Sequence, residues 1–277
     1  MRWFSPFAPS PDLGAVLACR YVATAAGRHD LIPDGCMDLV WSPRLGPVLC
    51  GPDTHAWWFE LPAGEPVAGV RFRAGAAPAV FRVEAASLVD RRVPLADLIG
   101  ARTARRLAER LEDASGPAAR MATLEQLVRD RATAPDSAAE LAALVAADPA
   151  RGVDDLVRHG GLSPRQLRRR FTRAVGYGPA FFARIARLQR FAAHAARHPG
   201  RGLAELAAAA GYVDQAHLAK DTRAIAGRTP RELVALLDRS SVAVDLAPAT
   251  PTGRRAGPGD GRSVQDPTRS RAARSAA

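Results

Sequence analysis

The chain has 277 residues, 47% of them hydrophobic, and a formal net charge of +11. This length and apolar content can supply the cores of two domains. Three cysteines without a C-x-x-C pair exclude a disulfide framework, and the lack of an apolar run of about 18 residues excludes a membrane-spanning helix. Since no signal peptide is recognised either, we expect a soluble, cytoplasmic protein with no membrane partner.

Proline and glycine residues divide the first hundred residues into short apolar runs. The runs occupy residues 37–41, 48–50, 56–61 and 67–72. Short apolar runs between turn signals are typical of antiparallel β-strands. In the last run Ala68, Val70 and Phe72 alternate with other residues, which predicts a strand with one buried face.

The apolar spacing changes to that of helices after residue 94. Helices are predicted at residues 95–111, 121–131 and 137–147, and Pro135 and Pro149 interrupt the pattern. We therefore expect an α+β chain in two domains, the first β-rich and antiparallel with following helices and the second all-α. The predicted limits are 1–135 for the N-terminal domain, 136–149 for a linker region, 150–238 for the second domain and 239–277 for a disordered basic tail.

Positive charge is concentrated in the second half of the chain. Residues 150–238 contain 16 basic and 7 acidic residues, whereas residues 1–149 contain 16 and 18. A basic region can attract a polyanion such as DNA, and a solvated basic surface explains the charge alone equally well. The sequence pattern within this region decides between the two interpretations.

Residues 153–179 and 203–230 follow the same plan. In each, apolar residues at helical spacing lead to a glycine turn, a second helix, a glycine and a proline. This order predicts two helix-turn-helix units. A helix from Pro179 to about residue 195 would join them, and because one turn of DNA is about 34 Å long, both second helices could enter successive major grooves.

The second helix of each unit has an outward face suited to base recognition. In the first unit Ser163 caps this helix while Leu167 and Phe171 point inward, and in the second unit Asp214 and Leu218 take the corresponding places. The outward residues are Arg165, Gln166, Arg168 and Arg169 in the first unit and Gln215, Ala216, His217 and Lys220 in the second. All of them except Ala216 can donate hydrogen bonds to guanine, adenine or phosphates.

Residues 150–237 resemble the DNA-binding domain of the AraC/XylS family of bacterial transcription regulators. The resemblance is carried by LSPRQLRRRF at 162–171, VGYGP at 175–179, GYVDQAHLAK at 211–220 and AGRTP at 226–230. It implies a monomeric unit that reads an asymmetric bipartite site, with base contacts from the eight outward residues named above. Thr222 stands where the family usually has an aromatic residue, so we expect the second unit to be looser or repacked.

The N-terminal region resembles a domain of unassigned function that precedes some AraC-type DNA-binding domains. The matching strings are IPDGCMDLVW at 32–41, CGPDT at 50–54, GVRFRAGA at 69–76 and VPLADLIG at 93–100. The resemblance implies a small β-barrel-like sensor domain, cupin-like or degenerate, that binds a ligand or mediates dimerisation.

Candidate ligand-binding residues in this domain are Cys36, His55, Trp58 and Arg71. Successive strand residues point to opposite faces, so only one of Trp57 and Trp58 can line a given pocket. The alternative is that one is a core residue and the other a surface or interface residue. Buried thiols are the alternative for the cysteines. Because His29 and His55 lack a third ligand at a recognisable spacing, we expect no metal and no cofactor.

The sequence as a whole predicts a non-enzymatic, sequence-specific transcription regulator. Its predicted partners are double-stranded DNA, RNA polymerase, a small-molecule effector and a second copy of the chain. One alternative is a sequence-independent, nucleoid-type DNA-binding protein, against which Gln166, Gln215 and His217 count as base readers. Another is a small-molecule-modifying enzyme fused to a DNA-binding domain, but the chain has no glycine-rich phosphate loop, nucleophile elbow or H-E-x-x-H string.

Overall fold

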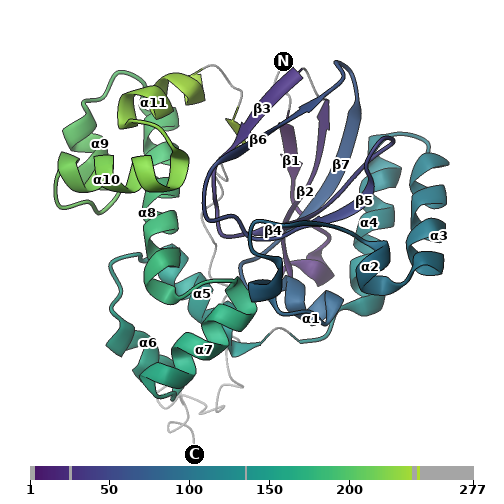
Figure 1. Cartoon of the computed structure of the whole chain (residues 1–277), viewed down its shortest axis with the longest axis horizontal. Helices are drawn as coiled ribbons and strands as arrows, with labels where there is room; N and C mark the ends of the chain where they lie inside the picture. The colour runs from purple at the N-terminus through teal and green to yellow at the C-terminus, as the bar shows by residue number, and fades with distance from the viewer. Residues whose placement is uncertain (1–3, 25–26, 135, 239–241, 244–277) are drawn as a thin grey trace, which may run out of the picture.

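The computed structural model describes residues 4–24, 27–134, 136–238 and 242–243 (Figure 1). A β-rich N-terminal domain with its own helices lies beside a helical C-terminal part. Most of the predicted basic tail, residues 239–277, is outside the described residues. Among the helices described, none combines the length and apolar character needed to cross a bilayer.

The N-terminal domain is built on an antiparallel six-stranded sheet in the order β1-β2-β7-β4-β5-β8. Its strands are β1 (Phe4–Phe7), β2 (Leu17–Thr24), β7 (Pro66–Phe72), β4 (Met37–Ser42), β5 (Gly46–Cys50) and β8 (Arg92–Pro94). A second sheet pairs β3 (Gly27–Leu31) with β6 (Trp57–Leu61) and with β9 (Val242–Ala243). Within the described residues β1 and β8 remain edges, so the domain is β-rich as predicted but its larger sheet is not closed into a barrel.

The central strand β7 is buried on both faces. Val70 and Phe72 are fully buried among the residues of the main N-terminal core, as predicted for that face. The opposite face was expected to be exposed, yet Arg71 is only 5% exposed and a Cβ atom at Gly69 would lie 2.3 Å from the Tyr21 ring. The absence of a side chain at Gly69 therefore lets Tyr21 cover this face.

Helices cover the core face of the larger sheet. They are α1 (Ala77–Phe81), α2 (Ala96–Ile99), α3 (Ala101–Glu112) and α4 (Pro117–Arg131), with short 3-10 helices η1 (Pro11–Leu13) and η2 (Ala85–Leu88). The predicted helix at 95–111 is divided into α2 and α3 because Gly100 adopts a φ of +85°. On α4, Leu124 and Val128 are fully buried. The carboxylate of Glu125, also buried, accepts hydrogen bonds from Ser10 and Arg20 and so attaches α4 to the segment before η1 and to β2.

Helix α5 (Ser137–Ala147) lies within the predicted linker region, residues 136–149, but packs in the C-terminal core. Leu141 and Val145 are each 1% exposed and belong to the same buried cluster as Leu167 and Ile185. The sequence pattern marks Pro149 as a boundary because proline ends the helix. The apolar face of α5 nevertheless has to be covered, so the C-terminal helical part begins at α5 rather than after Pro149.

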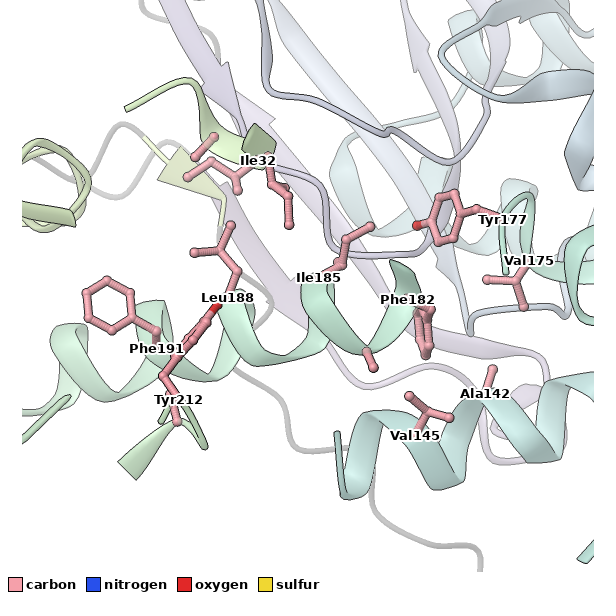
Figure 2. Packing of buried hydrophobic residues seen from close by; sticks show 14 of the residues in the cluster. Ile32, Ala142, Val145, Val175, Tyr177, Phe182, Ile185, Leu188, Phe191 and Tyr212 are labelled. Carbon is pink, nitrogen blue, oxygen red and sulfur yellow. The ribbon is translucent and has the colours of Figure 1, made fainter. Parts of the chain in front are cut away.

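The remaining helices form two units on either side of a long central helix (Figure 1). They are α6 (Val153–Gly160), α7 (Pro164–Val175), α8 (Pro179–Arg197), α9 (Leu203–Ala209), α10 (Gln215–Ala226) and α11 (Pro230–Asp238). Figure 2 shows Phe182, Ile185, Leu188 and Phe191 along α8, the predicted linker helix. All four are at most 2% exposed and contribute to one core that includes residues of both units. The two units are therefore joined by a continuous hydrophobic core.

Candidate nucleic-acid interface

The first helix-turn-helix unit consists of α6 and α7. Gly161 ends α6 in the left-handed conformation, with a φ of +60°, and Ser163 caps α7. The Gln166 backbone N–H donates to the Ser163 hydroxyl over 3.3 Å, and the Ser163 N–H donates to Gln166 Oε1 over 2.9 Å. This reciprocal capping box fixes the start of α7, while Leu167 and Phe171 bury its inner face.

The predicted reading residues of the first unit lie together on the exposed side of α7. Arg165, Gln166, Arg168 and Arg169 are all exposed. Among the described residues none forms an ion pair with the three arginines, so their guanidinium groups are available to a ligand. Gln166 already uses its carbonyl oxygen in the capping box, which leaves its amide N–H groups as donors.

The second unit consists of α9 and α10. Gly211, with a φ of +87°, makes the turn, and Asp214 caps α10 by accepting a 2.7 Å hydrogen bond from the His217 backbone N–H. Gln215, Ala216 and Lys220 are exposed, as predicted for reading residues. His217 is half-buried: its ring meets the Tyr212 ring edge-on, with centroids 5.1 Å apart.

A buried carboxylate on α10 is a feature that the sequence interpretation missed. Asp221 is 2% exposed, and its Oδ1 accepts a 2.8 Å hydrogen bond from Arg184 Nε on α8. Its Oδ2 lies 3.9 Å from Arg187 Nη2 and 3.8 Å from His217 Nε2. The signal was present in the sequence, since Asp221 follows the inward residue Leu218 by three positions and so shares its helix face.

Thr222 occupies the position where an aromatic residue was expected. It is fully buried, and its hydroxyl donates a 2.7 Å hydrogen bond to the Leu218 carbonyl oxygen one turn earlier. The hydroxyl is thus satisfied inside the core. Complete burial of this small side chain favours a repacked second unit over a loose one.

The N-terminal domain contacts the carboxyl-terminal end of both second helices. At the end of α7, Arg173 Nε lies 2.8 Å from Glu84 Oε1, and a Cβ atom at Gly176 would lie 2.5 Å from the Pro52 ring. Near the end of α10, the Ala56 N–H donates to the Ile225 carbonyl oxygen over 2.7 Å. Arg228 pairs with Asp30 over 3.1 Å.

The linker helix α8 is also in contact with the N-terminal domain. Gln189 Nε2 donates a 2.8 Å hydrogen bond to the Pro33 carbonyl oxygen. A Cβ atom at Gly35 would lie 2.3 Å from the Phe182 ring, and Ile32 is part of the C-terminal core, as Figure 2 shows. The predicted reading residues lie in the first half of α7 and α10, so the N-terminal domain holds the opposite ends of these helices.

The four predicted ligand-binding residues are not gathered at one place. Arg71 donates two 3.0 Å hydrogen bonds to Asp38 and lies 2.9 Å from Asp34, which also accepts a hydrogen bond from the Cys36 N–H. Trp58 is 52% exposed on β6, in the other sheet, with the Arg28 guanidinium 4.5 Å from its ring. The structure thus brings Cys36 and Arg71 together, and Arg71 already has carboxylate partners.

His55, Trp57 and Cys50 have local surroundings of their own in the N-terminal domain. The His55 side chain is 64% exposed beside Asp90, while Trp57 donates to Asp53 and stacks with Arg92 at 3.8 Å. Burial raises the pKa of the Cys50 thiol to about 12, so it stays protonated at neutral pH. In the part of the chain that the structure describes, no three His, Cys, Asp or Glu side chains gather in a way that could hold a metal ion.

The fold and this interface define a two-domain protein with a helix-turn-helix DNA-binding part. Comparison with known families agrees: residues 156–235 match a helix-turn-helix domain of the AraC type, and residues 5–94 match a domain of unknown function, DUF6597. The C-terminal match supports a DNA-binding transcription regulator and is to a family of regulators, not of enzymes.

Two solved structures of ToxT from Vibrio cholerae are similar over most of the chain. One has a TM-score of 0.42 and 8% sequence identity, with 84% of this chain and 98% of that chain covered. The other, of an apo ToxT variant, has a TM-score of 0.40 and 11% identity, with 84% and 96% covered. Similarity at this level says nothing about what this chain binds. No curated protein matches the sequence.

Proposed function

We propose that the chain is a sequence-specific transcription regulator that reads a bipartite site in duplex DNA. The observation that carries the proposal is the orientation of the second helices, α7 and α10. Each has a capped, exposed amino-terminal half bearing polar side chains, and a carboxyl-terminal end held inside the protein. This is the geometry by which a recognition helix enters the major groove with its first turns against the base edges.

The proposed base contacts follow from the donor groups on each helix. Arginine pairs with guanine O6 and N7 through two hydrogen bonds, and glutamine pairs with adenine N6 and N7. We assign base contacts to Arg165, Gln166, Arg168 and Arg169 on α7 and to Gln215, Ala216, His217 and Lys220 on α10. In this set Gln166 contributes its amide N–H donors, and Ala216 contributes an apolar contact only. Because the two sets differ, the two halves of the site differ in sequence.

The connection between the two helix-turn-helix units supports simultaneous contact with both halves of the proposed DNA site. Helix α8 and the core along it join the two units, and the N-terminal domain contacts α7, α8 and α10. The separation of the two recognition helices is therefore held constant. We expect affinity to fall when one base pair is inserted between the half-sites, since that insertion rotates one half by about a tenth of a turn.

Selection from random duplexes followed by competition gel shift tests this proposal. The full chain should enrich one sequence and bind it at least about 10³-fold more tightly than bulk genomic DNA at physiological salt. Equal binding to all duplexes, with a steep dependence on salt, would instead establish the nucleoid-type alternative.

We further propose that the N-terminal domain modulates DNA binding through its contacts with α7 and α10. Removing two of its anchoring carboxylates, with Glu84→Gln and Asp30→Asn, should change operator affinity although neither residue lies on the reading face. The control variant Asp97→Asn with Glu112→Gln makes the same charge change at exposed positions on α2 and α3. Equal affinities for both variants would refute modulation through this interface.

The remaining partners in this proposal are an effector bound by the N-terminal domain, RNA polymerase and a second copy of the chain. Of the proposed effector contacts Cys36, His55, Trp58 and Arg71, Cys36 and Arg71 lie together, so we place the proposed effector site at these two residues. Since Arg71 is already paired with Asp34 and Asp38, an effector that reaches it has to displace a carboxylate or bind the whole cluster. Isothermal titration of the effector into the Arg71→Lys variant and into the unchanged chain would test this by comparing the two affinities. Lysine cannot form both carboxylate pairs in the same geometry.

A further inference from the structure

Val213 is the most exposed of the large hydrophobic side chains in the described residues. It is 88% exposed, and the next, Leu45, is 54% exposed. Single exposed apolar residues are common on protein surfaces, so exposure alone has no functional meaning. The position of Val213 gives it one, because it directly precedes Asp214, the residue that caps the recognition helix α10.

The backbone on both sides of Val213 is fixed. Before it, the Tyr212 N–H donates to the Ala207 carbonyl oxygen over 3.0 Å, and the Tyr212 side chain is 5% exposed. After it, Asp214 Oδ1 accepts the 2.7 Å hydrogen bond from the His217 N–H. A β-branched side chain also has few rotamers. The isopropyl group is therefore held in water at a defined place beside the first turn of α10.

Most of the residues around Val213 are small and apolar, Asp214 excepted, and they adjoin a predicted base reader. A hollow of about 510 Å³ lies between α9 and the start of α10, and its walls include Ala204, Ala208, Val213 and Ala216. Gln215 lines the same hollow. An apolar group of the bound DNA can thus fit in this hollow, next to the Gln215 side-chain amide that we assign to a base edge.

We propose that Val213 contacts the 5-methyl group of a thymine in the major groove, next to the base read by Gln215. In the major groove, this methyl group is the apolar feature that distinguishes thymine, and small apolar side chains recognise it. Val213 is then a specificity-determining residue of the second half-site. The inference rests on the proposed function, since it requires α10 to enter the major groove.

Replacing thymine by deoxyuridine in the selected operator tests this contact, because it removes the methyl group and keeps the hydrogen-bonding edge. Each thymine of the second half-site is replaced in turn, and the affinity of the full chain is measured by gel shift. At one position the unchanged chain should lose about fourfold in affinity, the effect of one buried carbon group. The Val213→Ala chain should bind the thymine operator more weakly by a similar factor and should show no further loss with deoxyuridine there.

Val153→Ala is the matched control. Val153 is 43% exposed and begins α6 of the first unit, so this variant should keep the full deoxyuridine penalty. The inference is overturned if no thymine of the second half-site is sensitive, or if Val213→Ala keeps the penalty. A failure to select any preferred sequence would overturn the proposed function and this inference together, and so differs from failure of the methyl contact alone.

Discussion

The two helix-turn-helix units share one plan but are stabilised by different interactions. In the first, Phe171 is fully buried and its ring lies 5.7 Å from that of Phe182 on the linker helix. In the second, the corresponding position holds Thr222, whose hydroxyl bonds to its own helix. The second unit is instead connected to the linker helix by the buried Asp221 and the two arginines, Arg184 and Arg187.

The two units thus have the same arrangement of helices, although different kinds of side-chain interaction stabilise them. An aromatic contact involves no net charge, so it tolerates changes in salt, and much of its strength comes from the large apolar area that the rings bury. A buried carboxylate requires its cationic partners, and leaving either side unpaired is costly. We therefore expect the first unit to be destabilised most when buried side-chain volume is removed. The second unit should be destabilised most when the buried carboxylate loses its charge.

The largest expected effect is on the core of the first unit. Phe171→Ala should lower the free energy of unfolding by about 3–5 kcal/mol, because it removes a fully buried ring. Thr222→Val, which keeps the shape and removes one hydroxyl, should cost only about 1 kcal/mol. Urea denaturation followed by circular dichroism gives both values. Equal losses of unfolding free energy in the two variants would mean that these two core positions contribute equally to stability.

Asp221→Asn should lower the free energy of unfolding by about 1–3 kcal/mol, less than for a fully enclosed ion pair because Arg184 is 32% exposed. Asp155→Asn is the control, since Asp155 pairs with Arg158 on the surface of α6, and this substitution should cost no more than about 0.5 kcal/mol.

In gel shifts, Asp221→Asn should weaken recognition of the second half-site more than the first. A loss shared equally by both half-sites would contradict a local role for Asp221.

Substitutions on the reading faces should separate base contacts from phosphate contacts. Arg165→Ala or Arg169→Ala should each cost about 1–3 kcal/mol of binding free energy at one base position and relax the preference there. Arg170→Ala, on the same helix and exposed but outside the predicted set, is the control. A uniform loss across all sequences, with a smaller salt dependence, would reassign the residue to a phosphate.

Substitutions at the two helix caps should differ least in their effect on the free energy of unfolding. Ser163→Ala and Asp214→Ala each remove a side-chain acceptor from the start of a recognition helix and should cost about 1 kcal/mol of unfolding free energy. Asp214 should cost slightly more, since its carboxylate also interacts with the helix dipole. A much larger loss for either one would show that the cap also holds the turn.

The parts of the structure that depend on neighbouring residues in the chain could be predicted from the sequence. Caps such as Ser163 and Asp214, the glycine turns and the exposed faces of the recognition helices all follow local rules. The partners of Asp221 and Arg71 could not be predicted, because they come from segments that are distant in sequence. The strand order was inaccessible for the same reason, and the open edges follow from it.

Helix α5 changes where this protein can be divided. Its buried face, with Leu141 and Val145, covers the helices of the DNA-binding part although it precedes Pro149. Any exchange of N-terminal domains between proteins of this design would therefore have to carry α5 with the DNA-binding half. A junction placed after Pro149 would transplant recognition helices whose core lacks the side chains of α5, whereas a junction before Asp136, the residue that caps α5, would keep them.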